Sequence, residues 1–218
     1  MFLLDEYSPE VNVAVTTFNA DGEMLDQRIS HNVVTNTGRT WLSMLVGSDD
    51  YSQDPPPPHI TSKIKYMGFG CGGVLQTGPN FSRTQSELVT VTALEDPVAI
   101  TKDGDVETYL KQVRNQIMGD VFFPGNFRTR FICDFVESEI AFPGNTTRTS
   151  QVSVGTAVPI SEAGLYLSTA NPKFTPGIDP QANETDPTLP NDLVAYNIFE
   201  PITITPNVTL RVEWELRF

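Results

Sequence analysis

The 218-residue sequence is poor in the side chains that carry most enzyme chemistry. It has two cysteines, Cys71 and Cys133, and two histidines, His31 and His59. Nucleophilic catalysis needs a base beside the nucleophile, and a zinc site needs nitrogen or sulfur ligands at short spacings. Neither can be assembled from so few residues, and the two cysteines are expected to be buried free thiols. We therefore predict that the protein is not an enzyme and binds no metal or other cofactor.

Basic residues are scarce as well. Lys and Arg total 14 against 27 Asp and Glu, and the formal net charge is -13. Nucleic-acid phosphates and anionic lipids repel such a chain, so we expect neither a nucleic acid nor a membrane as a partner. No apolar run is long enough to span a bilayer. The apolar start, residues 1–4, is followed by Asp5 and Glu6 and has no basic segment, so it is not expected to be a signal peptide.

Two patterns could suggest a ligand site. Residues 68–73 match G-x-G-x-x-G, and Glu95 lies at about the spacing expected in a dinucleotide-binding fold. However, residues 74–79 are predicted to lead into a turn and do not begin a helix, so we interpret the glycines as a bend where backbones approach closely. The acidic residues of 49–54 and 103–105 form no calcium-loop pattern and are expected to be solvated. No small-molecule substrate is predicted.

Proline, in contrast, is abundant. The 17 prolines lie between short apolar runs, as in folds built from many short strands. The clearest strand is 208–218, where apolar and charged residues alternate without a fault from Leu210 onward and place Trp214 on the apolar face. Further strands are predicted at 11–18, 24–34, 60–69, 88–100, 127–142, 152–158, 162–168, 193–199 and 202–205.

One short helix is predicted near residues 37–46, with Asn36 or Thr37 as N-cap, Trp41 on its apolar face and Gly47 just past its end. Residues 106–118 have helical spacing, which favours a second helix. Residues 81–87 are polar and predict a loop. Long loops are predicted at 48–59, with four consecutive prolines, and at 171–192. The predicted fold is a single domain, 1–218, an all-β antiparallel β-sandwich with one short α-helix.

A succession of short motifs runs through residues 30–218. They are Asn32-Val-Val-Thr-Asn36 with Gly38 and the Trp41-Leu42 helix, Ile64-Lys-Tyr-Met-Gly-Phe-Gly70, Leu94-Glu-Asp-Pro-Val98, Tyr109-Leu-Lys-Gln-Val113, the strand around Phe131, Val158-Pro-Ile-Ser-Glu-Ala-Gly-Leu-Tyr166, Leu193-Val-Ala-Tyr, Phe199-Glu-Pro-Ile and Leu210-Arg-Val-Glu-Trp-Glu-Leu. In this order they resemble a family of virion structural proteins from tailed bacteriophages. Residues 171–192 are an insertion relative to the family pattern.

The resemblance implies a β-rich virion component without enzymatic activity, made in the bacterial host cytoplasm. It would act as a homo-oligomer and through contacts with other virion structural proteins. The tail, neck, baseplate or fibre-attachment region is the expected location, with a capsid decoration protein as the alternative. The resemblance also implies a strand at 109–113, so strand is preferred over helix there.

A carbohydrate-binding β-sandwich for host recognition is the alternative from another class, with Tyr51, Tyr166 and Tyr196 as candidate contacts. Around Glu162, backbone amides are expected to hold the carboxylate, and Gly164 is expected to allow close backbone approach or unusual torsions. A structural turn that fixes sheet geometry is preferred there over direct partner binding. The candidate residues for structural or assembly roles are Trp41, Gly68, Gly70, Glu162, Gly164, Leu165, Pro201 and Trp214.

Overall fold

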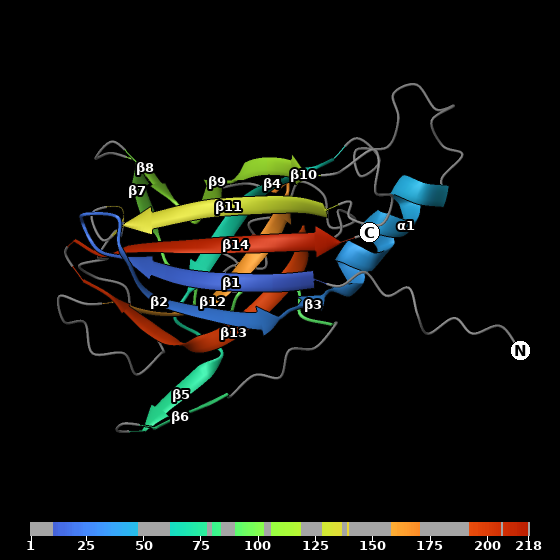
Figure 1. Cartoon of the computed structure of the whole chain (residues 1–218). Coiled ribbons are helices and arrows are strands. Elements are labelled where there is room, and N and C mark those ends of the chain that lie inside the picture. The colour runs from blue at the N-terminus through green and yellow to red at the C-terminus, as the bar shows by residue number, and fades with distance from the viewer. Residues whose placement is uncertain are drawn as a thin grey trace, which may run out of the picture.

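Two antiparallel sheets make up most of the part of the chain that the structure describes (Figure 1). The structure is a computed structural model, and it describes residues 11–47, 62–77, 80–83, 90–102, 106–118, 128–136, 139, 158–170, 192–205 and 207–217. Within these residues each of the two main sheets has five strands, and buried side chains from both sheets form one shared core. The predicted all-β sandwich with one short helix is confirmed.

Sheet A is centred on the terminal strand. Its members in spatial order are β10 (Arg114–Met118), β11 (Arg128–Val136), β14 (Thr209–Arg217), β1 (Val11–Phe18) and β2 (Met24–His31). In β14, Trp214 lies opposite Val13 of β1 and Phe131 of β11. The apolar residues of β14 are buried, whereas Arg217 is exposed and Arg211 partly exposed. The apolar residues that alternate along this strand in the sequence therefore face the core, and the charged residues between them lie on the opposite face of sheet A.

Sheet B is the second layer. Its members in spatial order are β3 (Val33–Val34), β13 (Leu193–Ile204), β12 (Val158–Leu167), β4 (Ile64–Gly70) and β9 (Leu110–Gln112). The sequence predicted two strands at 193–205, but β13 runs through Pro201 without interruption. The pairing of β13 with β12 shifts register between Ile160 and Glu162, and a bulge tolerates a proline because the ladder there needs no N–H donor.

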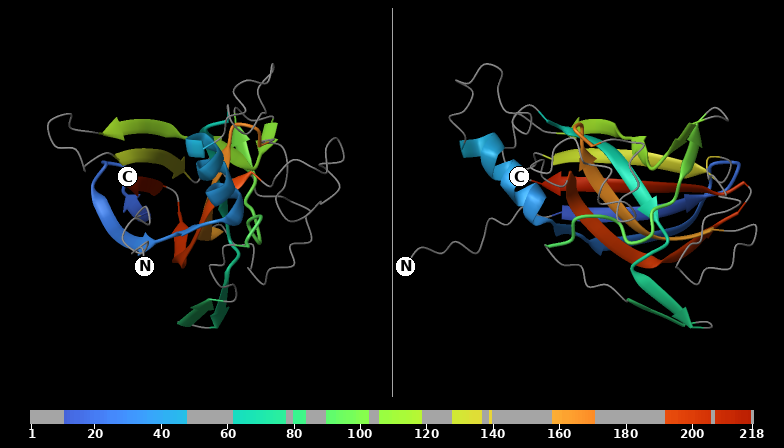
Figure 2. Two further views of the ribbon diagram at one scale, coloured as in Figure 1. Left: turned by 90° about the vertical axis from the view of Figure 1, so that its right-hand side faces the viewer. Right: turned by 180° about the vertical axis from the view of Figure 1, so that it is seen from behind.

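The core lies between the two sheets. The rings of Phe69 from β4 and Phe135 from β11 stack across it, with centroids 4.8 Å apart and planes at 11°. Trp214, Leu165 and Val13 are fully buried in the same cluster. The left-hand view of Figure 2 shows the two layers, with the helix in front of them.

Among the described strands, the chain passes from one sheet to the other with a single intervening residue at two corners of the sandwich. At one corner β2 of sheet A is followed by β3 of sheet B, and at the other β9 of sheet B is followed by β10 of sheet A. The backbone N–H of Val113, between β9 and β10, donates to the carbonyl of Lys65 at 2.9 Å. Strands that change sheets in this way close the sides of a sandwich.

Helix α1 (Asn36–Gly47) begins one residue earlier than predicted, and its N-cap is different. The hydroxyl of Thr35 accepts a hydrogen bond from the N–H of Gly38 at 3.1 Å, so Thr35 caps the helix and the predicted caps are wrong. The reason is that Thr35 is the last extended residue, since its own N–H donates to Val194 of β13 at 3.0 Å. Trp41 anchors the helix by donating from Nε1 to the carbonyl of Ser62 at 3.0 Å.

Residues 106–118 are not helical, and the strand that the resemblance implied at 109–113 is present as β9 (Leu110–Gln112). They form β8 (Val106–Thr108), β9 and β10, so the helix alternative is wrong. Helical spacing misled because the segment is three short strands: β8 pairs with β7 (Ile100–Lys102), β9 with β4 and β10 with β11. The apolar residues of this segment thus lie on or between strands of three different sheets and do not form one face of a helix.

Three other predictions were wrong. Residues 90–99 are irregular and not a strand, apart from a bridge between Pro97 and Gly70. The N–H groups of Glu95 and Asp96 donate to a side chain instead of to a sheet, and Pro97 has no N–H.

The predicted turn at 74–79 and loop at 81–87 contain the hairpin β5 (Val74–Thr77) and β6 (Asn80–Arg83). These two strands form a separate two-stranded sheet among the described residues.

Several predictions fall outside the described residues. These are the loop at 48–59, the turn at 103–105, the strand residues 152–157 and the loop at 171–192 except Asp192. Asp192 accepts hydrogen bonds from the N–H of Leu167 at 3.0 Å and from the hydroxyl of Thr169 at 2.6 Å.

Candidate functional site

The face of sheet B that is turned away from sheet A is covered by residues of the 90–99 segment. Leu94 of this segment is buried in a second apolar cluster together with Tyr166 of β12 and Tyr196 of β13. Sheet B is therefore buried on both faces, which explains why β13 is buried continuously from Leu193 to Phe199. A polar group on this covered face must find partners within the protein.

Glu162 is such a group, and its side chain has no exposed surface. Its Oε1 accepts hydrogen bonds from the backbone N–H groups of Gly72 (3.2 Å) and Asp96 (2.8 Å). Its Oε2 accepts from the N–H of Glu95 (3.1 Å) and from the hydroxyl of Tyr196 (2.8 Å). We call these five residues the Glu162 cluster. The prediction that backbone amides hold this carboxylate is confirmed, but Glu162 lies within β12 and not in a turn.

The Glu162 cluster ties a strand to two segments that are distant in the sequence. Burial raises the pKa of the Glu162 carboxyl, and the donated hydrogen bonds from Asp96, Glu95, Tyr196 and Gly72 oppose that rise. Burial and the nearby carboxylate also raise the pKa of Tyr196, which keeps its hydroxyl protonated and able to donate. The cluster thereby fastens the 90–99 segment to sheet B.

The glycine-rich bend is shaped around the same carboxylate. A Cβ atom on Gly70 would lie 2.2 Å from Oε1 of Glu162, and one on Gly72 would lie 2.6 Å from Cβ of Glu95. Gly73 has a positive φ of 75°, and its N–H donates to Oε2 of Glu95 at 2.5 Å. The amides of Gly72 and Gly73 thus bind the chain's own carboxylates.

Gly68 and Gly164 lie opposite each other on β4 and β12. A Cβ atom on Gly164 would lie 2.6 Å from Cδ1 of Leu193, and one on Gly68 would lie 3.1 Å from the side chains of Leu94 and Leu110. The two glycines leave room for the apolar residues that cover sheet B. The close backbone approach or unusual torsion predicted at Gly164 is wrong, because side chains of Leu193, Tyr166 and Leu94 fill the space beside it and its φ is not positive.

The predicted structural or assembly residues are mostly internal. Gly70 and Glu162 meet in the Glu162 cluster, and Gly68 and Gly164 pair beside it. Three others lie in the core between the sheets, namely Trp41, Leu165 and Trp214. All of these residues are buried, and only Pro201 is partly exposed. The buried residues of this set therefore contribute to packing inside the fold.

Two of the three tyrosines predicted as candidate sugar contacts are buried. Tyr166 is 4% exposed and Tyr196 is fully buried, so neither can form an open stacking surface. Tyr51 lies outside the described residues.

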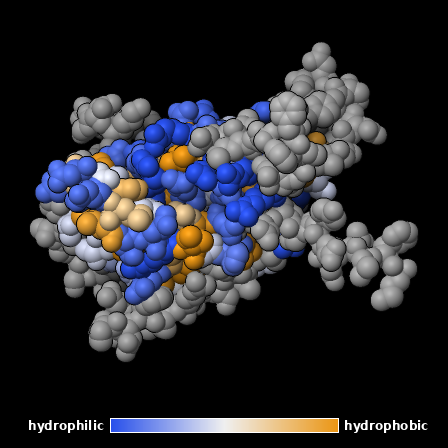
Figure 3. Space-filling view, in the orientation of Figure 1, coloured by the Kyte–Doolittle hydropathy of each residue, from blue (hydrophilic) through white to orange (hydrophobic). Residues whose placement is uncertain are grey.

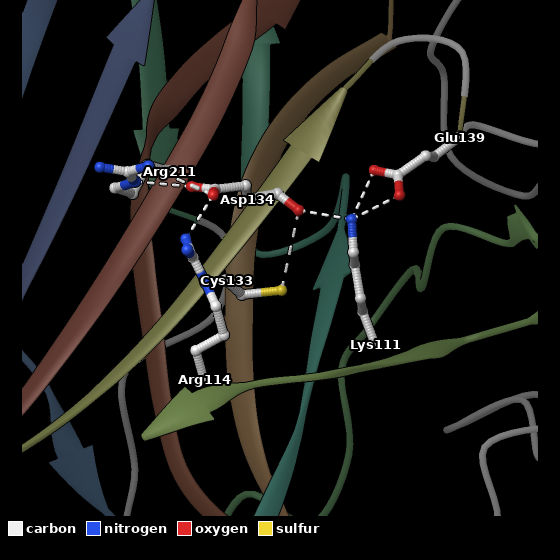
Figure 4. Close-up of polar contacts among 6 residues, drawn as sticks. All are labelled: Lys111, Arg114, Cys133, Asp134, Glu139 and Arg211. Atoms are coloured by element: carbon white, nitrogen blue, oxygen red, sulfur yellow. Dashed lines mark hydrogen bonds and ion pairs between the residues drawn. The ribbon is translucent and has the colours of Figure 1, made fainter. Parts of the chain in front are cut away.

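The outward face of sheet A carries networks of opposite charges that the sequence alone did not connect. Asp134 of β11 accepts hydrogen bonds from Arg211 of β14 (Nε to Oδ1, 2.6 Å) and from Arg114 of β10 (Nη2 to Oδ2, 2.5 Å) (Figure 4). Its carbonyl accepts from Nζ of Lys111 at 2.6 Å, and Lys111 also pairs with Glu139 at 2.5 Å. Because Lys111 belongs to β9, this network joins sheet B to sheet A at the β9–β10 corner.

Both cysteines are free and buried, as expected. Cys133 lies beside the network of Figure 4, with its Sγ 3.9 Å from the carbonyl oxygen of Asp134. Burial raises the pKa of the Cys133 thiol to about 12. The thiol is therefore protonated at neutral pH and a poor nucleophile.

Glu215 of β14 is the centre of a second network on sheet A. It accepts from Arg130 at 2.9 Å and from Arg217 at 2.8 Å, and it lies 3.3 Å from Arg128. Burial alone would raise the pKa of the Glu215 carboxyl, but the hydrogen bonds from Arg130 and Arg217 and the charge of Arg128 outweigh burial and lower it. Glu215 thus holds three arginines of β11 and β14 on one face.

We expect Glu215→Gln to lower the free energy of unfolding at neutral pH by about 1.5–3 kcal/mol, the range for hydrogen bonds to charged groups. The folded state has the lower pKa, so the unfolded state binds more protons between the two pKa values, and stability rises with pH there. The difference between wild type and variant should therefore be full above the ordinary value of 4.5 and shrink as pH falls below it. Urea titrations across acidic pH measure this, and a pH-independent difference would contradict it.

Exposed apolar side chains concentrate on β2. Among the large hydrophobic residues the structure describes, Ile29 is 71%, Met24 60%, Leu25 57% and Leu45 37% exposed, and the first three lie on this one strand. Figure 3 shows hydrophobic patches interrupting the mainly hydrophilic face that includes sheet A. Sequence alternation did not single out β2, because its outermost place in the sheet is a property of the topology.

The part of the chain that is described forms neither a metal-ligand group nor a membrane-spanning helix. Within it, no group of three or more His, Cys, Asp or Glu residues is placed to hold a metal ion. The one helix in these ranges is too short to cross a membrane. No family model, curated protein or solved structure matches this chain in comparisons with known proteins.

Proposed function

We propose that the protein is a non-enzymatic structural component of a tailed-phage virion, acting through self-association and through contacts with other virion proteins. The observation that carries this proposal is the concentration of exposed apolar residues on β2. Ile29, Met24 and Leu25 are more exposed than the other large hydrophobic side chains described, and patches of this kind mark interaction surfaces.

The interior supports the same proposal. The Glu162 cluster and the glycines around it fix the segment that covers sheet B, and the polar groups of the cluster are used in internal hydrogen bonds. Such a rigid sandwich presents a constant surface to its neighbours. The succession of motifs described above, from Asn32 to Leu216, favours a place in the tail, neck, baseplate or fibre-attachment region. A capsid decoration protein is the alternative within this class.

Deletion of the reading frame from the phage genome, with complementation in trans, tests the proposal. A tail, neck, baseplate or fibre-attachment component predicts incomplete particles by electron microscopy and a loss of infectious titre that the complementing copy restores. A decoration protein predicts complete particles that lose their genome at a lower temperature.

Other outcomes contradict the proposal. Complete, stable particles that fail only to adsorb to the host would favour the carbohydrate-binding alternative, and binding of the purified protein to host glycans would support that reading. Complete particles with normal stability and adsorption would exclude a structural role in the virion.

A further inference from the structure

β2 is the outermost strand of sheet A, and Figure 1 shows it beside β1 at the boundary of the sheet. Among the strands the structure describes, β1 alone forms a backbone ladder with it in sheet A. The exposed fraction is 71% for Ile29 and 57% for Leu25. An edge strand that exposes apolar side chains is a template for pairing with another strand.

We propose that β2 pairs antiparallel with β2 of a second copy of this chain, about a two-fold axis at Gln27, so that two copies of sheet A join into one continuous sheet. This inference rests on the self-association that the proposed function includes and names the surface responsible. An isologous pair of this kind closes on itself and gives a dimer.

The residues of β2 are complementary to themselves about Gln27. In antiparallel pairing with the axis there, Asp26 lies opposite Arg28 of the second copy, and Leu25 lies opposite Ile29. The two Gln27 side chains meet at the axis, where amides can hydrogen-bond to each other. Opposite charges and apolar pairs placed directly across a ladder stabilise it.

Neighbouring registers lack this complementarity. Residues directly opposite each other must point to the same face of the joined sheet, so the axis has to pass through a residue of β2. An axis at Asp26 would place Asp26 against Asp26 of the other copy, and an axis at Arg28 would place arginine against arginine. Like charges directly opposite each other destabilise a ladder. The charges on β2 therefore select Gln27.

The surroundings of β2 define the length of the new ladder. Arg28 donates to the carbonyl of Glu200 at 2.9 Å, and Asn197 donates to the carbonyl of His31 at 3.1 Å, so β13 contacts the second half of the strand. The register between β1 and β2 shifts next to Leu25, where a bulge ends the regular edge. Residues 25–29 are the segment available to a second copy.

The charged pair has room for this contact. Arg28 already lies 2.9 Å from Asp26 of its own strand and 3.3 Å from Glu200, but the side chain of Asp26 is 50% exposed. In the dimer, each Asp26 would lie between two Arg28 side chains, one from each copy. This local attraction opposes the repulsion between two chains that each have a formal net charge of -13.

Sedimentation of the full chain over a concentration series, at about 0.15 M salt so that distant charges are screened, tests the proposal. The wild type should be in a reversible monomer–dimer equilibrium. Asp26→Arg and Arg28→Asp should each raise the dimer Kd about tenfold or more, because each creates two like-charge pairs. An equimolar mixture of the two variants should form dimers again, since every facing pair is then opposite in charge. Unchanged circular dichroism spectra verify that both variants fold.

Cross-linking tests the register. Gln27→Cys places the two new thiols opposite each other at the axis, so mild oxidation should yield a covalent dimer. In the matched control, Ile29→Cys, the two thiols would be about 13 Å apart along the strands, beyond the reach of a disulfide. Wild type is the control for Cys71 and Cys133, which are buried.

Three results would overturn the inference: a wild type that stays monomeric at every concentration, a dimer Kd that neither charge reversal changes, or efficient cross-linking by Ile29→Cys and not by Gln27→Cys. These results concern the isolated protein. If they were obtained, the protein could still have a virion role through contacts with other proteins. Conversely, a β2 dimer could form even if deletion of the reading frame left the particles normal. Failure of the dimer inference is therefore distinguishable from failure of the proposed function.

Discussion

Replacement of Trp214 by alanine should lower the free energy of unfolding by about 3–5 kcal/mol, the range for removing a buried aromatic side chain. Trp214 is fully buried in the middle strand of sheet A, opposite Val13 on β1 and Phe131 on β11. The cavity left by the indole would therefore open where β1, β11 and β14 meet. Denaturant titrations followed by circular dichroism would measure the loss.

Two further variants make this measurement specific. Trp214→Phe keeps an aromatic ring in the core and should cost less than Trp214→Ala. Thr40→Ala, on an exposed position of α1, should change stability by no more than about 0.5 kcal/mol. A change of that small size for Trp214→Ala would mean that the terminal strand is not packed against its neighbours as described.

Replacement of Glu162 by alanine should be at least as damaging, with a loss of about 3 kcal/mol or more. Three backbone N–H groups and the hydroxyl of Tyr196 would lose the acceptor that the buried Glu162 side chain supplies, and each unsatisfied buried group costs about 1–3 kcal/mol. The 90–99 segment would also lose its attachment to sheet B. Faster amide hydrogen exchange at Glu95 and Asp96 should therefore accompany the loss of stability.

Glutamine provides the matched comparison. Glu162→Gln keeps the shape, but its amide nitrogen cannot accept, so at least one backbone N–H loses its partner, and an intermediate loss is expected. Glu200→Gln, the same change at an exposed glutamate on β13, should alter stability by less than about 1 kcal/mol. Equal effects at the two positions would contradict the role assigned to the Glu162 cluster.

A strand could be predicted from the sequence where apolar and polar residues alternate regularly. The terminal strand alternates between apolar and charged residues because one of its faces lies on the core, and a slip of one residue would expose Trp214. The helix was equally clear from its apolar face. The cap on Thr35 was missed because it depends on a hydrogen bond to Val194, which is distant in the sequence.

The 90–99 segment shows why other predictions failed. Its apolar residues predict a strand, and Val91, Leu94 and Val98 are indeed buried. However, the amides of Glu95 and Asp96 donate to the Glu162 carboxylate, and this tertiary contact overrides strand propensity. For the same reason, Glu162 could be predicted to bind amides, but the residues that supply those amides could not be identified before the fold placed them together.

Edge positions are a further property that the sequence did not reveal. A central strand and an edge strand could each contain Met24, Leu25 and Ile29. Only the order of the strands shows that these residues lie at the edge of sheet A. The self-complementary charges around Gln27 became meaningful once that edge was known. The sequence thus contains the complementary residues around Gln27, whereas the strand order shows that they lie on an edge that a second copy can reach.

The amount of this protein in purified phage particles tests the proposed function most directly. Particles banded by density and washed at high salt would be analysed by quantitative mass spectrometry against the major capsid protein. The proposal predicts that the chain remains with the particles at a fixed number of copies per particle. Its absence from banded particles, with all of the protein in the soluble fraction of the lysate, would contradict a structural role in the virion.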